Sequence, residues 1–261
     1  MSDFDWRSAS DADVDHQYSP SQHALRPLDD YLVEYATLSA PYRSATLCHP
    51  HDPLVVYIHG GYWQRLSAAD SLFNASDALA HGISLHAVDY TLAPEATVMQ
   101  MVNECIADIL SVLNALQPTR VVIAGCSAGA HLAAMSVRHS SLRERVDGVA
   151  LLSGIYDVRP IVRTPTNEPL GLTEASATEV SPLLLPQVPP PARALLAVGR
   201  SESSEFIRQN REYGELLSRQ GAEVATHVVE ERDHFNLPYD LLREGTIVGD
   251  WVLARLKGHA S

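Results

Sequence analysis

One short motif constrains the fold of this chain more than any other feature. Residues 121–124 form an apolar, mostly β-branched run, and Gly125-Cys126-Ser127-Ala128-Gly129 follows it directly. Small and apolar residues with helical spacing come next. This order predicts a strand, a sharp turn and a helix, in which the turn exposes the hydroxyl of Ser127 at the strand end. Ser127 is therefore the candidate nucleophile, with a plain glycine-rich turn as the alternative.

The rest of the chain alternates between strand and helix patterns. Apolar runs predict strands at residues 54–58, 83–90, 121–126, 149–153, 194–199 and 224–229, with a further short strand at 45–48. Helical spacing predicts helices at residues 27–39, 67–81, 97–116, 128–139, 204–220 and 239–256. Because parallel strands need crossover helices, the alternation predicts an α/β fold, a mostly parallel central sheet with helices on both faces.

Length and composition fit one domain over residues 1–261, since 46% hydrophobic content can bury a substantial core. Residues 1–26 are polar and aperiodic, which predicts an extended N-terminal arm or loose cap. Residues 160–191 contain eight of the 16 prolines and no long periodic segment. Loops of this length in compact domains are more often functional, so we predict a lid or cap insertion over the active site, with a passive connector as the alternative.

Charge, termini and cysteines narrow the possible partners. The formal net charge of −13 argues against nucleic acid and anionic membranes, which repel an acidic surface. The acidic N-terminus differs from a signal peptide, and no apolar run is long enough to span a membrane, so we expect a cytoplasmic protein. Three cysteines without metal-ligand spacing imply neither a disulfide framework nor a metal site. The oligomeric state is unknown at this point.

Acyl transfer at a serine needs a base beside the hydroxyl, because a neutral hydroxyl is a weak nucleophile. In hydrolases with this type of elbow, the base lies in the loop after the last strand. Among 12 histidines, His234 alone follows the last predicted strand in this way. His59 and His131 also lie near the motifs, but an ordering hydrogen bond and a packed helix position explain them better.

The base in turn needs a carboxylate that orients it, and the expected chain order is Ser, acid, His. The loop after the strand at 194–199 offers Glu202 and Glu205. We predict Glu202, because Glu205 falls in the first turn of the next helix, where its charge already favours the helix dipole. Asp157 is a further alternative, whereas Asp233 cannot easily reach around to the ring of the next residue.

Two glycines follow the first central strand, in His59-Gly60-Gly61-Tyr62-Trp63. Glycines let the backbone approach a ligand closely and leave their N–H groups outside the sheet. The backbone N–H of Ala128, together with that of Gly60 or Gly61, is therefore the predicted oxyanion hole.

These motifs together resemble a known family. The matching segments are residues 18–21, 59–63, 89–90, 92–94, 125–132, 153–157, 203–206 and 233–235. In them the chain resembles the kynurenine formamidase (arylformamidase) family of α/β hydrolases, close to the hormone-sensitive-lipase-like esterases. The Tyr-Trp pair after the glycines is the more diagnostic part, since lipase-like relatives share the glycines without it. The resemblance implies the α/β-hydrolase fold.

The resemblance also implies a reaction of tryptophan catabolism, the hydrolysis of N-formyl-L-kynurenine to L-kynurenine and formate. The substrate is a small molecule, and no metal or organic cofactor takes part. The Ser, acid and His roles map onto Ser127, Glu202 and His234. The chain departs from the family pattern in having Glu202 in place of Asp, in having Cys rather than His before the nucleophile, and in its short stretch before Leu54.

Substrate contacts and competing functions complete these expectations. Tyr62 and Trp63 are predicted to stack on the aryl ring, or else to pack the glycine loop against the N-terminal arm. The carboxylate of a kynurenine substrate needs a partner, for which Arg65, Arg159 and Arg163 are candidates. The same serine, histidine and glycines fit a carboxylesterase of small aryl or alkyl esters, and a non-catalytic binding protein on the same scaffold is a third hypothesis.

Overall fold

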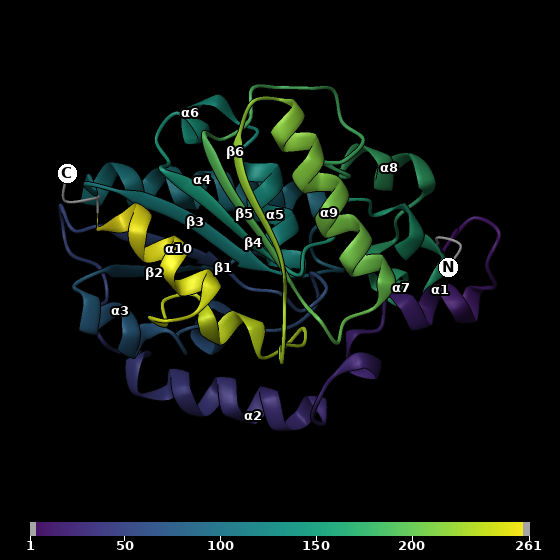
Figure 1. The fold of residues 1–261 in the computed structure, drawn as a ribbon, viewed down its shortest axis with the longest axis horizontal. Helices are drawn as coiled ribbons and strands as arrows, with labels where there is room; N and C mark the ends of the chain where they lie inside the picture. Colours follow the sequence, from purple (N-terminus) through teal and green to yellow (C-terminus); the bar gives the residue numbers. More distant parts are fainter. Residues whose placement is uncertain (1–3, 258–261) are drawn as a thin grey trace.

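A computed structural model describes residues 4–257, so residues 1–3 of the predicted arm and residues 258–261 of the predicted domain lie outside it. A six-stranded sheet runs through the molecule in the order β2-β1-β3-β4-β5-β6 (Figure 1). The strands are β1 (Leu54–Ile58), β2 (Ser84–Val88), β3 (Val121–Cys126), β4 (Gly148–Leu152), β5 (Arg193–Gly199) and β6 (Glu223–Val229). All five pairings are parallel, which confirms the predicted α/β class.

Ten α-helices accompany the sheet in residues 4–257. They are α1 (Asp11–Gln17), α2 (Leu28–Ser39), α3 (Ala75–His81), α4 (Val98–Leu116), α5 (Ala128–Ser136), α6 (Ser140–Arg143), α7 (Asn167–Leu170), α8 (Glu174–Glu179), α9 (Ser204–Arg219) and α10 (Ile247–Leu256). Short 3₁₀ helices are η1 (Pro20–His23), η2 (Ala40–Tyr42), η3 (Ala68–Asp70), η4 (Arg159–Arg163) and η5 (Leu237–Asp240). None of the helices within residues 4–257 has the length and apolar character that a membrane span requires.

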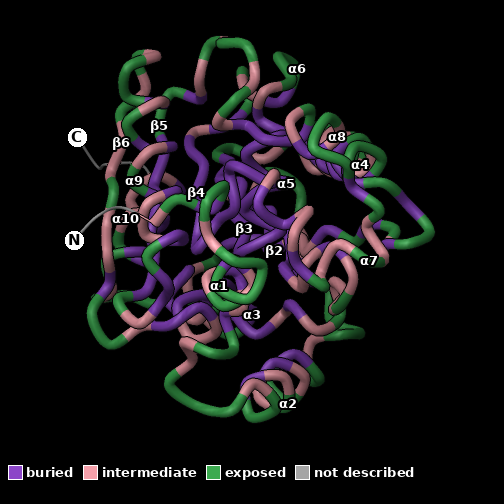
Figure 2. The backbone as a smooth tube through the Cα atoms, turned by 90° about the vertical axis from the view of Figure 1, so that its right-hand side faces the viewer, coloured by how far each residue is buried: buried purple, intermediate pink, exposed green. Residues whose placement is uncertain are grey.

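The central strands β1, β3 and β4 are buried on both faces, as their continuous apolar runs predict, whereas the edge strand β6 is partly exposed. One hydrophobic cluster joins alternate strand residues such as Val56 to the apolar sides of α4, α5 and α9. A second cluster joins the intervening residues, such as Val55, to α2, α3 and α10. Figure 2 shows buried backbone around β3, β4 and α5 in the middle of the molecule and exposed residues at its periphery.

Two predicted helices are shorter than expected. The helix at 67–81 was wrong in its first half, where η3 replaces it, because side chains satisfy the local backbone groups. Asp89 accepts from the N–H of Ala68, and Ser39 Oγ accepts from the N–H of Leu72. The helix at 239–256 was wrong in the same way: α10 begins only after Gly245, which has a φ of +80°. Thr246 then caps α10 by accepting the N–H of Gly249.

Two other segments near the ends of the sheet differ from expectation. Residues 45–48 do not form a strand, although they run beside β2, where Leu47 O accepts a hydrogen bond from the backbone N–H of Leu85. The predicted extended arm is instead helical within residues 4–26, because Ser10 caps α1 by accepting from the N–H of Asp13. Val14 and Tyr18 of this segment are buried against the domain, so it is a packed part of the fold.

The proline-rich segment 160–191 consists of short pieces, mainly η4, α7 and α8. This agrees with the absence of a long periodic pattern in its sequence. Thr166 is its one residue that lines the cavity beside Ser127. A role of the segment as a lid stays a prediction.

Candidate active site

Ser127 lies at a sharp turn between β3 and α5, at the carboxyl edge of the sheet. Its backbone has a φ of +57° and a ψ of −122°, a strained conformation for a residue with a side chain. Hydrogen bonds hold it there: its N–H donates to Leu152 O at 2.8 Å, and its carbonyl accepts from the N–H of His131 at 3.1 Å. The turn thus has the geometry that the Gly-x-Ser-x-Gly motif predicts.

The glycines of this motif are required by close packing. A Cβ atom on Gly129 would lie 2.0 Å from Ile58 O, since α5 crosses directly over the end of β1. A Cβ atom on Gly125 would lie 2.3 Å from Gly129 O. Both substitutions would push α5 away from the sheet and displace Ser127.

The two other predicted chemical groups meet at the same edge of the sheet. Glu202 follows β5 and His234 follows β6, and both side chains are almost fully buried. Nδ1 of His234 lies 2.7 Å from Oε2 of Glu202. Because a carboxylate only accepts hydrogen bonds, Nδ1 carries the proton and leaves Nε2 of the imidazole as a proton acceptor.

Glu202 is held in place by further donors. Its Oε1 accepts from the N–H of Gly199 at 2.7 Å and from the hydroxyl of Ser153 at 2.6 Å. Ser153 was missed at the sequence level, although a serine directly after the apolar run of β4 is a signal that could have pointed to it. Its φ of +50° turns the residue toward the neighbouring strand end.

The loop of His234 is fixed by Asp233, which takes no part in the contact with Glu202. Oδ1 of Asp233 accepts from the N–H groups of Phe235 and Asn236, both at 2.9 Å. Oδ2 accepts from the N–H of Leu25 and from the hydroxyl of Tyr31, both at 2.7 Å. Asp233 therefore joins the loop of His234 to the N-terminal segment.

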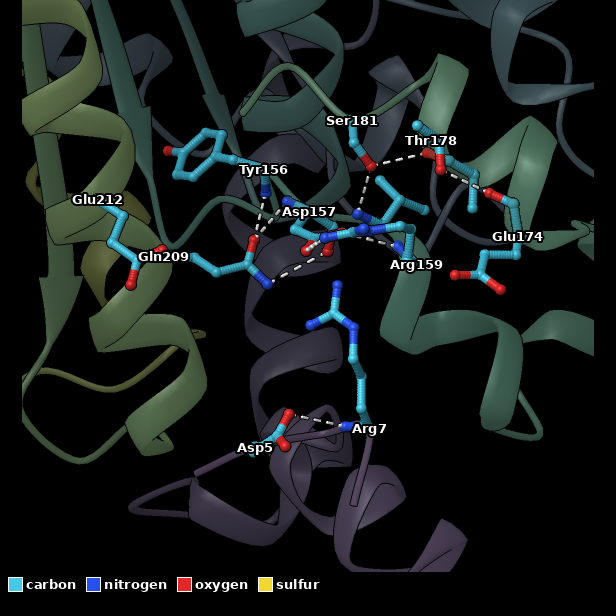
Figure 3. A network of polar contacts seen from close by, with 12 residues as sticks. Asp5, Arg7, Tyr156, Asp157, Arg159, Glu174, Thr178, Ser181, Gln209 and Glu212 are labelled. Carbon is cyan, nitrogen blue, oxygen red and sulfur yellow. Dashed lines mark hydrogen bonds and ion pairs between the residues drawn. The ribbon is translucent and has the colours of Figure 1, made fainter. Parts of the chain in front are cut away.

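The alternative acids have other partners. Glu205 pairs with Arg208 at 2.8 Å and accepts from the hydroxyl of Tyr18 at 3.0 Å. Asp157 forms a two-pronged ion pair with Arg159. Figure 3 shows this pair beside Gln209, whose side-chain oxygen accepts the N–H groups of Tyr156 and Asp157.

The alternative bases have structural partners too. Burial lowers the pKa of His59, whose Nδ1 donates to Gly60 O at 2.9 Å. His131 is fully buried, and its Nε2 lies 2.6 Å from Val180 O. Burial lowers the pKa of His131 to about 4, against a smaller upward effect of that hydrogen bond. The neutral ring accepts the indole N–H of Trp63 at Nδ1, at 3.3 Å.

The backbone donors converge near the serine. A Cβ atom on Gly60 would lie 3.3 Å from Cβ of Ser127, so the glycine loop directly adjoins the elbow. Gly61 has a φ of +96°, which favours glycine. Ala128 begins α5, where the first N–H groups have no partner within the helix. Among the described residues, the N–H groups of Gly60, Gly61 and Ala128 have no acceptor.

Gly60 and Gly61 line a cavity of about 300 Å³, whereas Ala128 is buried directly behind the lining residue Ser127. Its lining residues are Tyr18, Ser19, Pro20, Ser21, Leu28, Leu32, Tyr35, Tyr57, Gly60, Gly61, Tyr62, Gln64, Arg65, Leu66, Ser71, Phe73, Cys126, Ser127, Thr166, His234, Phe235 and Pro238. Ser127 and His234 thus share one cavity. In the part of the chain that the structure describes, no hydrogen bond joins them, as is common for catalytic pairs before substrate binds.

The predicted aromatic pair is divided. Tyr62 lines the cavity, and its hydroxyl donates to Tyr18 O, which ties the glycine loop to the N-terminal segment. Trp63 is fully buried and lies outside the set of lining residues. Its indole contacts His131 edge-on, so it does not reach the cavity as a stacking partner. Trp63 packs the glycine loop against α5, whereas the contact with the N-terminal arm that the alternative predicts is made by Tyr62.

Known proteins resemble this chain in sequence and in fold. Residues 55–237 match a family model described as an alpha/beta hydrolase fold. Kynurenine formamidase of Danio rerio is 32% identical over 95% of this chain and 97% of its own length. The Salmo salar kynurenine formamidase is 32% identical over 96% of both chains. A hormone-sensitive lipase from a metagenome library has a similar fold, with a TM-score of 0.65, 19% identity, and coverage of 98% of this chain and 100% of that one.

Proposed function

Since the chain belongs to the kynurenine formamidase family of α/β hydrolases, we propose that it hydrolyses an aryl formamide, N-formyl-L-kynurenine, to L-kynurenine and formate. Ser127, His234 and Glu202 act as nucleophile, base and orienting acid. The observation that carries the proposal is the buried bond of 2.7 Å between His234 and Glu202, at a cavity that Ser127 also lines.

In the first half-reaction, Oγ of Ser127 attacks the formyl carbon while Nε2 of His234 takes the hydroxyl proton. The carbonyl π electrons move to the formyl oxygen. Glu202 stabilises the imidazolium that forms and does not itself take the proton. The tetrahedral intermediate then collapses, the C–N bond breaks, and His234 returns the proton to the departing aryl amine.

In the second half-reaction, a water molecule attacks the formyl ester of Ser127. His234 takes one proton from this water and delivers it to Oγ as the bond between Oγ and the formyl carbon breaks, so that formic acid leaves and the enzyme returns to its starting state. Formic acid then releases its remaining proton to solvent and becomes formate, and no redox change occurs in either half-reaction. The scheme therefore needs no group beyond the side chains, the backbone and water.

The oxyanion of both intermediates is bound by the N–H groups of Ala128 and of Gly60 or Gly61. One donor of this kind typically stabilises a transition state by about 3 kcal/mol. The close contact between Gly60 and the elbow and the open N–H groups support this role. Tyr62, together with the other aromatic residues of the lining, offers a surface for the aryl ring.

A comparison of two substrates tests this function. The parent enzyme should hydrolyse N-formyl-L-kynurenine with a kcat/KM no lower than that for p-nitrophenyl acetate. Ser127→Ala should lower kcat for both by about 10⁴-fold or more. Ser218→Ala, on the exposed side of α9, serves as the matched serine control and should retain parental rates.

The outcomes separate the competing functions. A preference for the ester by several orders of magnitude would assign the chain as a carboxylesterase of small esters. If the parent hydrolyses neither substrate, and the parent and Ser127→Ala bind kynurenine equally well, the result would support a non-catalytic binding protein.

A further inference from the structure

The charge of the cavity wall differs from that of the chain as a whole. The chain carries 32 acidic and 19 basic residues, yet no aspartate or glutamate is among the described residues that line the cavity. Arg65 is the one arginine or lysine in that lining. An anion that enters this cavity therefore meets one arginine and no carboxylate in the described wall itself.

Arg65 is held by the glycine loop that adjoins the elbow. Its N–H donates to Gly61 O at 3.0 Å, which closes a turn over the residues between them. Arg65 is exposed and also lines the cavity, so it is accessible both to solvent and to a molecule bound beside Ser127.

The guanidinium of Arg65 has no partner in the described part of the chain. Among residues 4–257, no carboxylate lies within 4.0 Å of its side-chain nitrogen atoms and none of these atoms donates a hydrogen bond, whereas its backbone N–H donates to Gly61 O. An arginine free of protein partners can bind a carboxylate through two parallel N–H···O bonds.

The other two candidate arginines are already occupied. Both side-chain oxygens of Asp157 accept from Arg159, which is only 18% exposed (Figure 3). Arg163 donates to Trp6 O, to Ala9 O and to the carboxylate of Asp11, and so fastens the N-terminal segment. Neither residue lines the cavity.

We propose that Arg65 binds the carboxylate of the substrate and makes the enzyme selective for aryl formamides that carry one. The proposal rests on the proposed function for the formamide and extends it to the rest of the substrate. It has a second consequence. Since no acidic residue lines the described cavity, the α-ammonium group of kynurenine has no ion-pair partner there and contributes little to binding.

Substitution of Arg65 by glutamine tests the proposal. Arg65→Gln should lower kcat/KM for N-formyl-L-kynurenine by about 10- to 100-fold, mainly through KM, as expected for loss of a charged hydrogen-bonded contact. The rate on formanilide, which lacks the carboxylate, should change by less than about twofold. Arg211→Gln on α9 removes one positive charge far from the cavity and should leave both rates unchanged.

A substrate analogue tests the second consequence. The analogue of N-formyl-L-kynurenine without its α-amino group should keep kcat/KM within a few-fold of that of the parent substrate.

Two results with Arg65→Gln would contradict the proposal. An equal loss of kcat/KM on formanilide and on N-formyl-L-kynurenine would show that the substitution disturbs the glycine loop, and an unchanged KM for N-formyl-L-kynurenine would exclude the carboxylate contact. Either result overturns the proposal.

An inhibition measurement separates this proposal from the proposed function. Hydrolysis of p-nitrophenyl acetate is measured in the presence of 4-phenylbutyrate or of its neutral amide. In Arg65→Gln, inhibition by the carboxylate should weaken by about 10-fold or more while inhibition by the amide stays constant. This pattern supports the anion site even if the parent enzyme fails to cleave formamides, and its absence rejects the site.

Discussion

The hydroxyl of Ser153 donates a hydrogen bond of 2.6 Å to Oε1 of Glu202, whose Oε2 lies 2.7 Å from Nδ1 of His234. The N–H of Gly199 donates to the same Oε1 at 2.7 Å. A glutamate side chain is one methylene longer than the aspartate of the family pattern. The two donors at Oε1 fix this longer side chain so that its other oxygen meets the imidazole.

Ser153→Gly removes the hydroxyl and tolerates the φ of +50° at this position without the strain that alanine would meet. A hydrogen bond to a charged group contributes about 1.5–3 kcal/mol. We expect kcat to fall by about 10-fold with KM within twofold, because Glu202 then orients His234 less well. Ser136→Ala is the control, since the buried hydroxyl of this serine has no hydrogen-bond partner among residues 4–257. A change in KM alone, or an unchanged kcat with a lowered Tm, would assign Ser153 a purely structural role.

Glu202→Gln should lower kcat by about 10³- to 10⁴-fold, because an amide neither stabilises the imidazolium nor holds the required tautomer. Glu205→Gln is the matched control. It should lower Tm, because it loses the charge partner of Arg208, and leave kcat within about tenfold of the parent. Single-turnover rates on p-nitrophenyl acetate distinguish the two variants. A larger loss of kcat in Glu205→Gln than in Glu202→Gln would show that Glu205, and not Glu202, orients His234.

Gly60→Ala tests the glycine loop. Its Cβ would lie 2.9 Å from Cys126 O and 3.3 Å from Cβ of Ser127, so the loop must move away from the elbow. We expect kcat to fall by about 10²-fold or more through loss of an oxyanion donor. Gly82→Ala, after α3, has a positive φ of 64° but no neighbour within 4 Å. It should destabilise the fold by about 1 kcal/mol without affecting kcat, and similar kcat values for both variants would contradict the proposed oxyanion role.

The free energy of unfolding should depend on pH through the buried side chain of His131. Burial lowers the pKa of His131 to about 4, below the ordinary value of 6.5 expected in the unfolded chain. The folded state therefore binds fewer protons between these values, so the contribution to stability is complete above pH 6.5 and is lost as pH falls toward 4. The loss amounts to about 3 kcal/mol at most. Urea unfolding from pH 7.5 to 4.5 should show a shallower pH slope for His131→Gln than for the parent, and parallel slopes would refute the assignment.

The sequence predicted the sheet well, because β1, β3, β4 and β5 are mainly apolar runs and β3 is also marked by its motif. The sequence-based prediction of helix boundaries was wrong where hydrogen bonds from side chains, rather than apolar periodicity, determine the backbone conformation. Asp89 and Thr246 satisfy backbone groups and interrupt helices that the apolar spacing alone would continue. The helix α1 was missed because seven residues are too few to establish a period, although Ser10 is a typical N-cap.

The site shows the same division. Ser127, Glu202 and His234 could be proposed from their order relative to the strands, because the carboxyl ends of parallel strands meet at one edge of the sheet. The contacts of Ser153 with Glu202 and of Asp233 with Tyr31 join residues far apart in the sequence, so their partners could not be predicted from a local pattern. The buried contact of Trp63 with His131 likewise required knowledge of which residues the fold brings together.

The N-terminal segment forms part of the cavity wall, and its contacts lead to the opposite end of the chain. Gln17 accepts hydrogen bonds from Ser203 and Ser204, which lie 186 and 187 residues later, and Leu25 donates to Asp233, 208 residues later. On the ribosome, residues 10–31 emerge well before these partners and contact them only after the loop of His234 has left the exit tunnel. The cavity is therefore completed only when this loop has been made, and the nascent chain must keep the apolar side of α2 uncovered until then.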